Sequence, residues 1–160
     1  MGNRRLTRSD KKVDVKPTIS EMLKTRLYRF AEFCDEPVKD VAERLCVDGA
    51  VSSIVIDEIK IWFRRDYRRK NTITMGHLER PRLKVSTSIN RGKVTIKFKQ
   101  RDFDQLSTLA YSLDLTPTTT AAILIRMALD SKLFMQWYIG TYLKHLGTEE
   151  IRQIYKLLKL

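Results

Sequence analysis

Residues 94–99 read Val94-Thr95-Ile96-Lys97-Phe98-Lys99, with an apolar side chain at every second position. This alternation predicts a β-strand with one buried and one exposed face, because successive side chains on a strand point in opposite directions. A helical pattern follows, and a Thr-Pro-Thr break at 116–118 separates it from a strongly apolar second helix, predicted from about Thr118 to Phe134. The apolar positions of the first helix are Phe103, Leu106, Leu109, Ala110 and Leu113.

The same order of strand, helix, break and helix occurs near the N-terminus. Residues 13–19 alternate, Ser20 opens a helical pattern, and Pro37 interrupts it before a second helix. The two copies align at a constant offset, since Leu27 matches Leu106 and 106 − 27 = 79. The same offset pairs Ala31 with Ala110, Asp35 with Asp114 and Leu45 with Leu124. In both copies the spacing of the apolar residues changes from the period of a strand, 2, to that of a helix, 3.6. The recurrence of this change at one offset indicates an internal duplication.

This pattern resembles the ribbon-helix-helix family, to which MetJ and Arc belong. The resemblance covers about half of the chain, from Val15 to Cys46 in the first copy and from Val94 to Leu129 in the second. It implies a mainly α fold with short β-ribbons, in which tandem ribbon-helix-helix-like units are followed by extra C-terminal helices. Members of the family read DNA with the ribbon.

Four residues depart from the family pattern. Asp35 and Asp114 stand at the turn between the helices, where the family usually has Gly. Pro17 removes an amide from the first strand, so we expect a weaker or distorted ribbon there. Thr120 falls where a core aliphatic residue is expected, which suggests that this helix is shifted or extended by a turn.

The chain is expected to have five segments. A hairpin is predicted where residues 83–89 alternate, Asn90-Arg91-Gly92 supplies turn residues, and the strand after Val94 follows. The apolar stripe from Ile151 to Leu158 indicates packing or oligomerisation. The segments are a flexible basic arm (1–12), a first unit (13–65), a basic linker with the possible hairpin strand (66–92), a second unit (93–134) and C-terminal helices (135–160).

The charge balance favours a polyanionic partner. The chain has 31 Lys and Arg residues against 19 Asp and Glu residues, a net charge of +12, and 42% hydrophobic residues for a core. Cations placed at phosphates release condensed counterions, so a basic globular protein commonly binds nucleic acid. No apolar leader or membrane span is expected, and we predict a cytoplasmic protein on the bacterial nucleoid or on plasmid or phage DNA.

We expect neither an enzyme nor a cofactor. Cys34 and Cys46 lack metal-ligand spacing, His77 and His145 are isolated, and there is no Gly-rich phosphate loop and no nucleophile–base set. Helical carboxylates such as Asp57 are usually solvated.

The predicted site has two parts. Side chains on the polar face of the strands would contact base edges in the major groove. Helix starts and basic runs would contact phosphates. The predicted base contacts are Thr95, Lys97, Lys99, Lys16, Thr18 and Ser20. The predicted phosphate contacts are Thr116, Thr118, Val38, Lys39, Arg4, Arg5, Arg8, Arg64, Arg65, Arg68 and Arg69.

These observations predict a sequence-specific regulator of transcription, of repressor type, that binds double-stranded DNA at repeated or palindromic half-sites as a homodimer or tetramer. Whether the ribbon strands pair within one chain or between chains stays open. A helix-turn-helix regulator using residues 38–60 is one alternative, with its turn at 46–49. A second is a plasmid or phage DNA-processing accessory protein, in a relaxosome or partition complex. RNA binding is disfavoured, because the aromatic residues fall on core faces.

Overall fold

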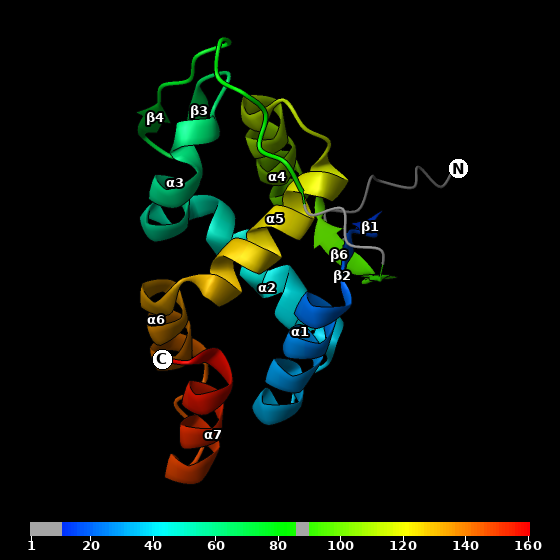
Figure 1. The fold of residues 1–160 in the computed structure, drawn as a ribbon, viewed down its shortest axis with the longest axis vertical. Coiled ribbons are helices and arrows are strands. Elements are labelled where there is room, and N and C mark those ends of the chain that lie inside the picture. The colour runs from blue at the N-terminus through cyan, green and yellow to red at the C-terminus, as the bar shows by residue number, and fades with distance from the viewer. Residues whose placement is uncertain (1–10, 86–89) are drawn as a thin grey trace, which may run out of the picture.

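The computed structural model describes residues 11–85 and 90–160 and confirms a mainly α protein with short antiparallel ribbons (Figure 1). The first half contains β1 (Lys12–Val15), β2 (Thr18–Ser20), α1 (Glu21–Cys34), α2 (Val38–Val51), α3 (Ser53–Ile59), a 3-10 turn η1 (Lys60–Trp62), β3 (Tyr67–Arg69) and β4 (Thr72–Thr74). The second half contains β5 (Arg91–Lys93), β6 (Ile96–Lys99), α4 (Gln100–Leu113), α5 (Pro117–Asp130), α6 (Lys132–Tyr142) and α7 (Thr148–Leu158).

The helices of the two copies match in length and spacing. Helices α1, α2, α4 and α5 each have 14 residues. The start of α4 follows that of α1 by 100 − 21 = 79 residues, and the start of α5 follows that of α2 by 117 − 38 = 79. The offset found in the sequence therefore relates two structural units.

Thr120 does not shift the second helix of its copy, contrary to our expectation. Its side chain is buried, and its hydroxyl donates to the Thr116 carbonyl at 2.9 Å. The polar atom is therefore satisfied within α5 itself, so a threonine replaces an aliphatic residue without a change of register.

The turn between the two helices is the same in both copies. Asp35 has φ 55° and ψ 44°, and Asp114 has φ 58° and ψ 44°. Both aspartates adopt the left-handed conformation that ends many helices, where glycine is the commonest residue. The chain thus uses Asp at the two positions where the family pattern has Gly.

One antiparallel ribbon joins the two copies within the single chain. Strand β1 pairs with β6 and β2 pairs with β5, and the two registers continue each other, so that Lys16 lies opposite Thr95. Pro17 separates β1 from β2, but its carbonyl accepts a hydrogen bond from the Val94 amide at 3.2 Å. The missing Pro17 amide interrupts the ladder without ending the pairing. Lys12, expected in the N-terminal arm, begins β1.

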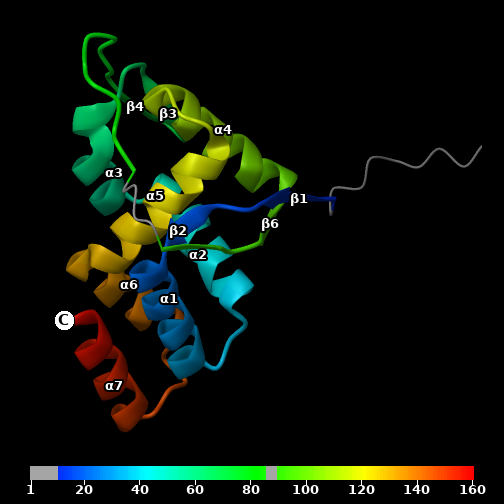
Figure 2. The same ribbon diagram turned by 45° about the vertical axis from the view of Figure 1, so that its right-hand side comes forward.

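The core lies where α2 and α5 pack against each other beneath the ribbon (Figure 2). Leu45 of α2 and its counterpart Leu124 of α5 are fully buried, and Ile96 and Phe98 of β6 join them in the same cluster. Outside this centre, α7 packs against α1, and its Ile154 and Leu158 are buried. The apolar C-terminal stripe therefore packs onto its own chain.

The predicted hairpin over residues 83–98 is wrong in its described part. Leu83 to Val85 form no strand, residues 86–89 lie outside the described residues, and Arg91 and Gly92 belong to β5, which pairs with β2. A different hairpin, β3–β4, forms in the segment where we expected a basic linker. Its buried Tyr67 donates a hydrogen bond to the Ala50 carbonyl at 2.7 Å, which anchors the hairpin to the end of α2.

Two predicted helix boundaries also differ. Helix α2 runs without interruption to Val51, so the turn of the helix-turn-helix alternative at 46–49 does not exist. Cys46 and Gly49 are buried against α5 instead, and the Cys46 thiol donates to the Ala121 carbonyl. The apolar helix predicted to reach Phe134 ends at Asp130, because Ser131 caps α6 by accepting from the Phe134 amide at 3.3 Å.

Candidate nucleic-acid interface

The ribbon divides its side chains between the core and the surface as the alternation predicts. Val15, Ile19, Val94, Ile96 and Phe98 are all buried. The intervening positions are at least partly exposed, and eight of the ten are exposed rather than half-buried. These ten residues, which we call the outer face of the ribbon, are Lys12, Asp14, Lys16, Thr18, Ser20, Arg91, Lys93, Thr95, Lys97 and Lys99.

The outer face combines hydrogen-bond donors with strong positive charge. Six of its ten residues are Lys or Arg, and Asp14 is the one carboxylate among them. All six predicted base-contact residues lie here, although they come from segments about 80 residues apart in the sequence. Folding therefore brings them onto one surface, and most of this surface is able to donate hydrogen bonds.

Ser20 and Lys99 occupy the same position in the two copies but differ in local role. Each is the residue before a helix, α1 or α4. The Ser20 hydroxyl oxygen accepts from the Leu23 amide at 3.2 Å, so it caps α1, whereas Lys99 makes no side-chain cap. The Ser20 hydroxyl hydrogen stays available as a donor.

Helices α2 and α5 flank opposite ends of the ribbon. A hollow lined by Lys12, Lys99, Asp40 and Glu43 joins the first half of α2 to one end of the ribbon. At the other end, Ser20 and Arg91 line a hollow together with Ala122, Ile123 and Arg126 of α5. Helix N-termini carry unpaired amides and a partial positive charge, so both starts suit phosphate.

The two helix starts are capped differently. Pro37 precedes α2 without a side-chain cap, and exposed Lys39 lies in the first turn beside half-buried Val38. Thr116 caps α5 by accepting from the Thr119 amide at 3.1 Å, while Thr118 is exposed. The capping role of Thr116 is thus observed, and the phosphate contacts of these four residues stay predictions.

The α2 end of the ribbon is the more acidic one. The hollow there is lined by four carboxylates and four cations, whereas the hollow at the α5 end has two arginines and no carboxylate; the four carboxylates are Asp40, Glu43, Asp48 and Asp102, and the four cations are Lys12, Arg44, Lys99 and Arg101. Burial raises the pKa of Glu43, and Asp40 and Asp102 raise it further, while the two lysines oppose them. Carboxylates repel phosphate, so this flank is electrostatically poorer for a DNA backbone than the α5 flank.

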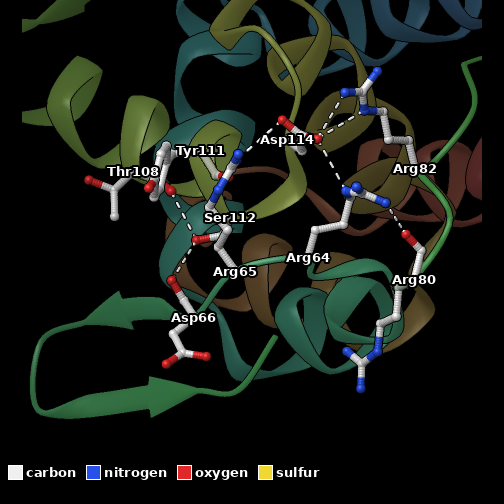
Figure 3. A network of polar contacts seen from close by, with 9 residues as sticks. All are labelled: Arg64, Arg65, Asp66, Arg80, Arg82, Thr108, Tyr111, Ser112 and Asp114. Atoms are coloured by element: carbon white, nitrogen blue, oxygen red, sulfur yellow. Dashed lines mark hydrogen bonds and ion pairs between the residues drawn. The ribbon is translucent and has the colours of Figure 1, made fainter. Parts of the chain in front are cut away.

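Most of the arginines in the 64–70 run bind the protein itself, and Figure 3 shows two of them, Arg64 and Arg65. Arg64 donates to Asp114 at 3.1 Å, and Arg65 donates to the same carboxylate at 3.2 Å and to the Tyr111 carbonyl at 2.9 Å. Arg82, which our sequence reasoning did not single out, completes the cluster with a contact at 3.0 Å. The hydrogen bond from Arg82, followed by that from Arg65, lowers the pKa of Asp114.

The β3 arginines differ from each other. Arg69 donates to the Val51 carbonyl at 2.9 Å and to the Ser53 hydroxyl at 3.3 Å, so it fastens the hairpin to the α2–α3 junction. Arg68 is exposed. These contacts favour a structural role for Arg64, Arg65 and Arg69, and a phosphate role for the run stays a prediction. Arg4, Arg5 and Arg8 lie outside the described residues.

Sequence reasoning missed the cluster around Asp114 because its members are distant in sequence. Arg82 lies 32 residues from Asp114. The Arg80 carbonyl also accepts from the Arg64 guanidinium, which ties the segment before Leu83 to the same turn. The only sequence signal was the basic composition of 64–82, which does not indicate a carboxylate partner.

Within residues 11–85 and 90–160, no group of three His, Cys, Asp or Glu residues is arranged to hold a metal. Both cysteines are buried, and burial raises the pKa of the Cys34 thiol to about 12. Neither thiol is thus a reactive thiolate at neutral pH. The helices in these ranges are too short or too polar to span a bilayer.

Comparison of the chain with protein-family models, with curated proteins and with solved structures finds no match. The geometry of the ribbon and its flanks therefore carries the functional argument.

Proposed function

We propose that this protein is a sequence-specific double-stranded DNA-binding regulator of transcription, of repressor type, that inserts its ribbon into the major groove. One chain would supply both strands, as two chains do in a ribbon-helix-helix dimer. The observation that carries the proposal is the outer face of the ribbon, where six cations and the polar side chains of Thr18, Ser20 and Thr95 stand on one exposed surface.

The dimensions and chemistry of the groove suit this surface. The major groove of B-DNA admits a two-stranded β-ribbon, and each base pair presents a distinct set of donors and acceptors there. Lys16, Lys97 and Lys99 would donate to guanine O6 and N7, and Thr18 and Thr95 would donate, accept or contact a thymine methyl group. The buried alternate positions hold the ribbon rigid, which is a condition for selective contacts.

Phosphate contacts would fix the register of the ribbon. Helices α2 and α5 line hollows beside its two ends, and the amides at their starts would contact the backbones that border the groove. The net charge of +12 would add affinity without sequence preference.

The test measures binding of the full chain to duplexes recovered from a random library, at several salt concentrations. We expect Lys16→Ala and Lys97→Ala each to weaken binding to the recovered site about tenfold or more, while affinity for unrelated duplex falls much less. Lys144→Ala, which removes the same charge from the exposed turn after α6, is the matched control and should leave selectivity unchanged. Equal loss with all three variants, or recovery of no common site, would contradict the proposal.

The rival DNA-binding interpretations lead to distinct outcomes. If residues 38–60 read the DNA, Ser52→Ala or Ser53→Ala would abolish specific binding and the ribbon variants would not; the uninterrupted α2 argues against this. A site overlapping a promoter supports repression. A site in a transfer origin or a centromere-like array would instead indicate a DNA-processing accessory role.

A further inference from the structure

The ribbon has an approximate two-fold axis that passes between Lys16 and Thr95. These two residues face each other across the ribbon and are 95 − 16 = 79 residues apart, so each is the counterpart of the other. Helices α1 and α2 correspond to α4 and α5 by the same offset, and the contacts of α1 with β2 and of α2 with β6 recur as those of α4 with β6 and of α5 with β2. The backbone is therefore arranged like that of a symmetric dimer. The two copies belong to one chain, however, so the side chains at equivalent positions need not be the same.

On the outer face, the side chains at equivalent positions differ in chemistry. The pairs that differ are Asp14 with Lys93, Lys16 with Thr95, Thr18 with Lys97, and Ser20 with Lys99. As a result, the ribbon end at Lys12 and Lys99 carries three lysines and an aspartate, and the end at Ser20 and Arg91 carries a serine, a threonine, a lysine and an arginine.

The two ribbon ends have the same net charge, but the flanks beside them do not. The charges of the hollow at the α2 end balance, because Lys12, Arg44, Lys99 and Arg101 line it together with Asp48 and with three further carboxylates, Asp40, Glu43 and Asp102. Their counterparts by the same offset at the α5 end are Thr119, Ala122 and Leu23, and Arg126 also lines that hollow.

The turns that lead into the flanking helices differ too. Arg64, Arg65 and Arg82 gather at Asp114, just before α5, which adds positive charge at that flank. At the α2 flank the corresponding turn contains Asp35 and Glu36, and Lys39 in the first turn is followed by Asp40.

We propose that a single chain binds a non-palindromic duplex site in one fixed orientation, with the stronger phosphate contacts on the α5 side. This inference rests on the proposed DNA-binding function and specifies its ligand. A symmetric ribbon reads both half-sites with the same donors, which makes the preferred site a palindrome. Here Asp14 would accept from cytosine N4 in one half-site, where its counterpart Lys93 would donate to guanine in the other. A palindrome cannot satisfy both halves.

The test compares the wild-type chain with a variant whose ribbon is made symmetric. The triple change Asp14→Lys, Lys16→Thr and Thr18→Lys gives three outer positions of the first copy the residues of the second. None of the three is buried, so the fold should be retained. Each protein selects sites from a random duplex library, and the chains per site are counted by mass. Asp57→Lys, an exposed change on α3 with the same increase in net charge, is the control.

We expect wild type and Asp57→Lys to select a site without two-fold symmetry, bound by one chain. Replacing either half of that site by the inverted copy of the other should weaken wild-type binding about tenfold or more. The triple variant should select a site with a palindromic centre. Hydroxyl-radical footprints of the wild type should show more protected DNA backbone on one side of the site, because the phosphate contacts are stronger on the α5 side.

The outcomes separate this inference from the proposed function. Selection of a palindrome by the wild type, or of an asymmetric centre by the triple variant, would overturn the inference while leaving DNA binding intact. Recovery of no site by the wild type would instead remove the proposed function itself, and the inference with it.

Discussion

Asp35 and Asp114 show how one backbone requirement is met by the same residue in two settings. Both have positive φ, a conformation that costs most residues about 1–2 kcal/mol and costs aspartate less. Asp114 has three arginine partners, whereas within the described residues no arginine binds Asp35. The same substitution should therefore have opposite effects at the two turns.

We predict that Asp35→Gly raises the free energy of unfolding by up to about 1 kcal/mol, because glycine adopts this conformation without steric cost. Asp114→Gly should lower stability, because the relief of the backbone does not replace three ion pairs. Urea unfolding of both variants and of the wild type measures the effect. A gain in stability from Asp114→Gly would show that the arginine cluster contributes little.

The shifted pKa of the Asp114 carboxylate also implies that the stability of the protein depends on pH. Its pKa is lowered in the folded state, chiefly by the hydrogen bond from Arg82 and then by that from Arg65. A lowered folded-state pKa gives stability that is present above the ordinary carboxyl pKa near 4 and is lost as the pH falls through the folded value.

We predict that Asp114→Asn, which keeps the left-handed turn, is less stable than wild type at pH 7, and that the two converge toward pH 2. Chemical unfolding across this range gives the comparison. Arg82→Ala should flatten the same dependence, because it removes the strongest partner. A difference that stays constant from pH 7 to pH 2 would contradict the assignment.

At the scale of elements, alternate residues of the ribbon have different roles: the buried ones stabilise the fold, and the exposed ones are those that we propose contact DNA. Phe98 is 1% exposed and packs in the core, and neighbouring Lys97 is on the outer face. Burial of an aromatic side chain contributes far more to folding than an exposed lysine does. A substitution at Phe98 should therefore affect stability, and a substitution at the neighbouring Lys97 should affect DNA binding.

We predict that Phe98→Ala costs about 3–5 kcal/mol of stability, whereas Lys97→Ala changes stability by no more than about 0.5 kcal/mol. Circular dichroism melts report the first effect, and the duplex affinity of Lys97→Ala reports the second. Phe98→Leu, which keeps most of the apolar volume, should recover much of the stability. A stable Phe98→Ala protein would mean that the ribbon is not held to the core by this face.

Local patterns predicted most elements but not their partners. The alternation around Ile96 and the helical stripe after it were sufficient to locate β6 and α4. Residues 83–89 also alternate, yet Leu83 to Val85 form no strand, and β6, the strand predicted to pair with this segment, pairs with β1. Asp48-Gly49 has the composition of a helix end, but the packing of Gly49 against Leu124 keeps α2 continuous. In both cases tertiary contacts overrode a local signal.

At the scale of the molecule, each copy depends on the other for its core. Strands β1 and β6 share one ribbon, and α2 and α5 bury Leu45 and Leu124 in one cluster. A single copy would expose this apolar surface and leave its strand unpaired.

We predict that fragments 1–85 and 86–160 are each poorly folded and that an equimolar mixture regains helicity and one cooperative transition. Far-UV circular dichroism with sedimentation analysis provides the measurement. Cooperative unfolding of either fragment as a monomer would show that the copies are independent domains.

The sequence alone determined the repeat of 79 residues, the two alternating strands, the helices that follow them and the basic character of the chain, because these depend on periodicity and charge, which are local or additive. Only the tertiary structure decided that the strands pair within one chain and that Lys16 faces Thr95. It also decided that Asp114 binds arginines from a distant segment. Such pairings depend on which surfaces exclude water together, and no single stretch of sequence contains that information.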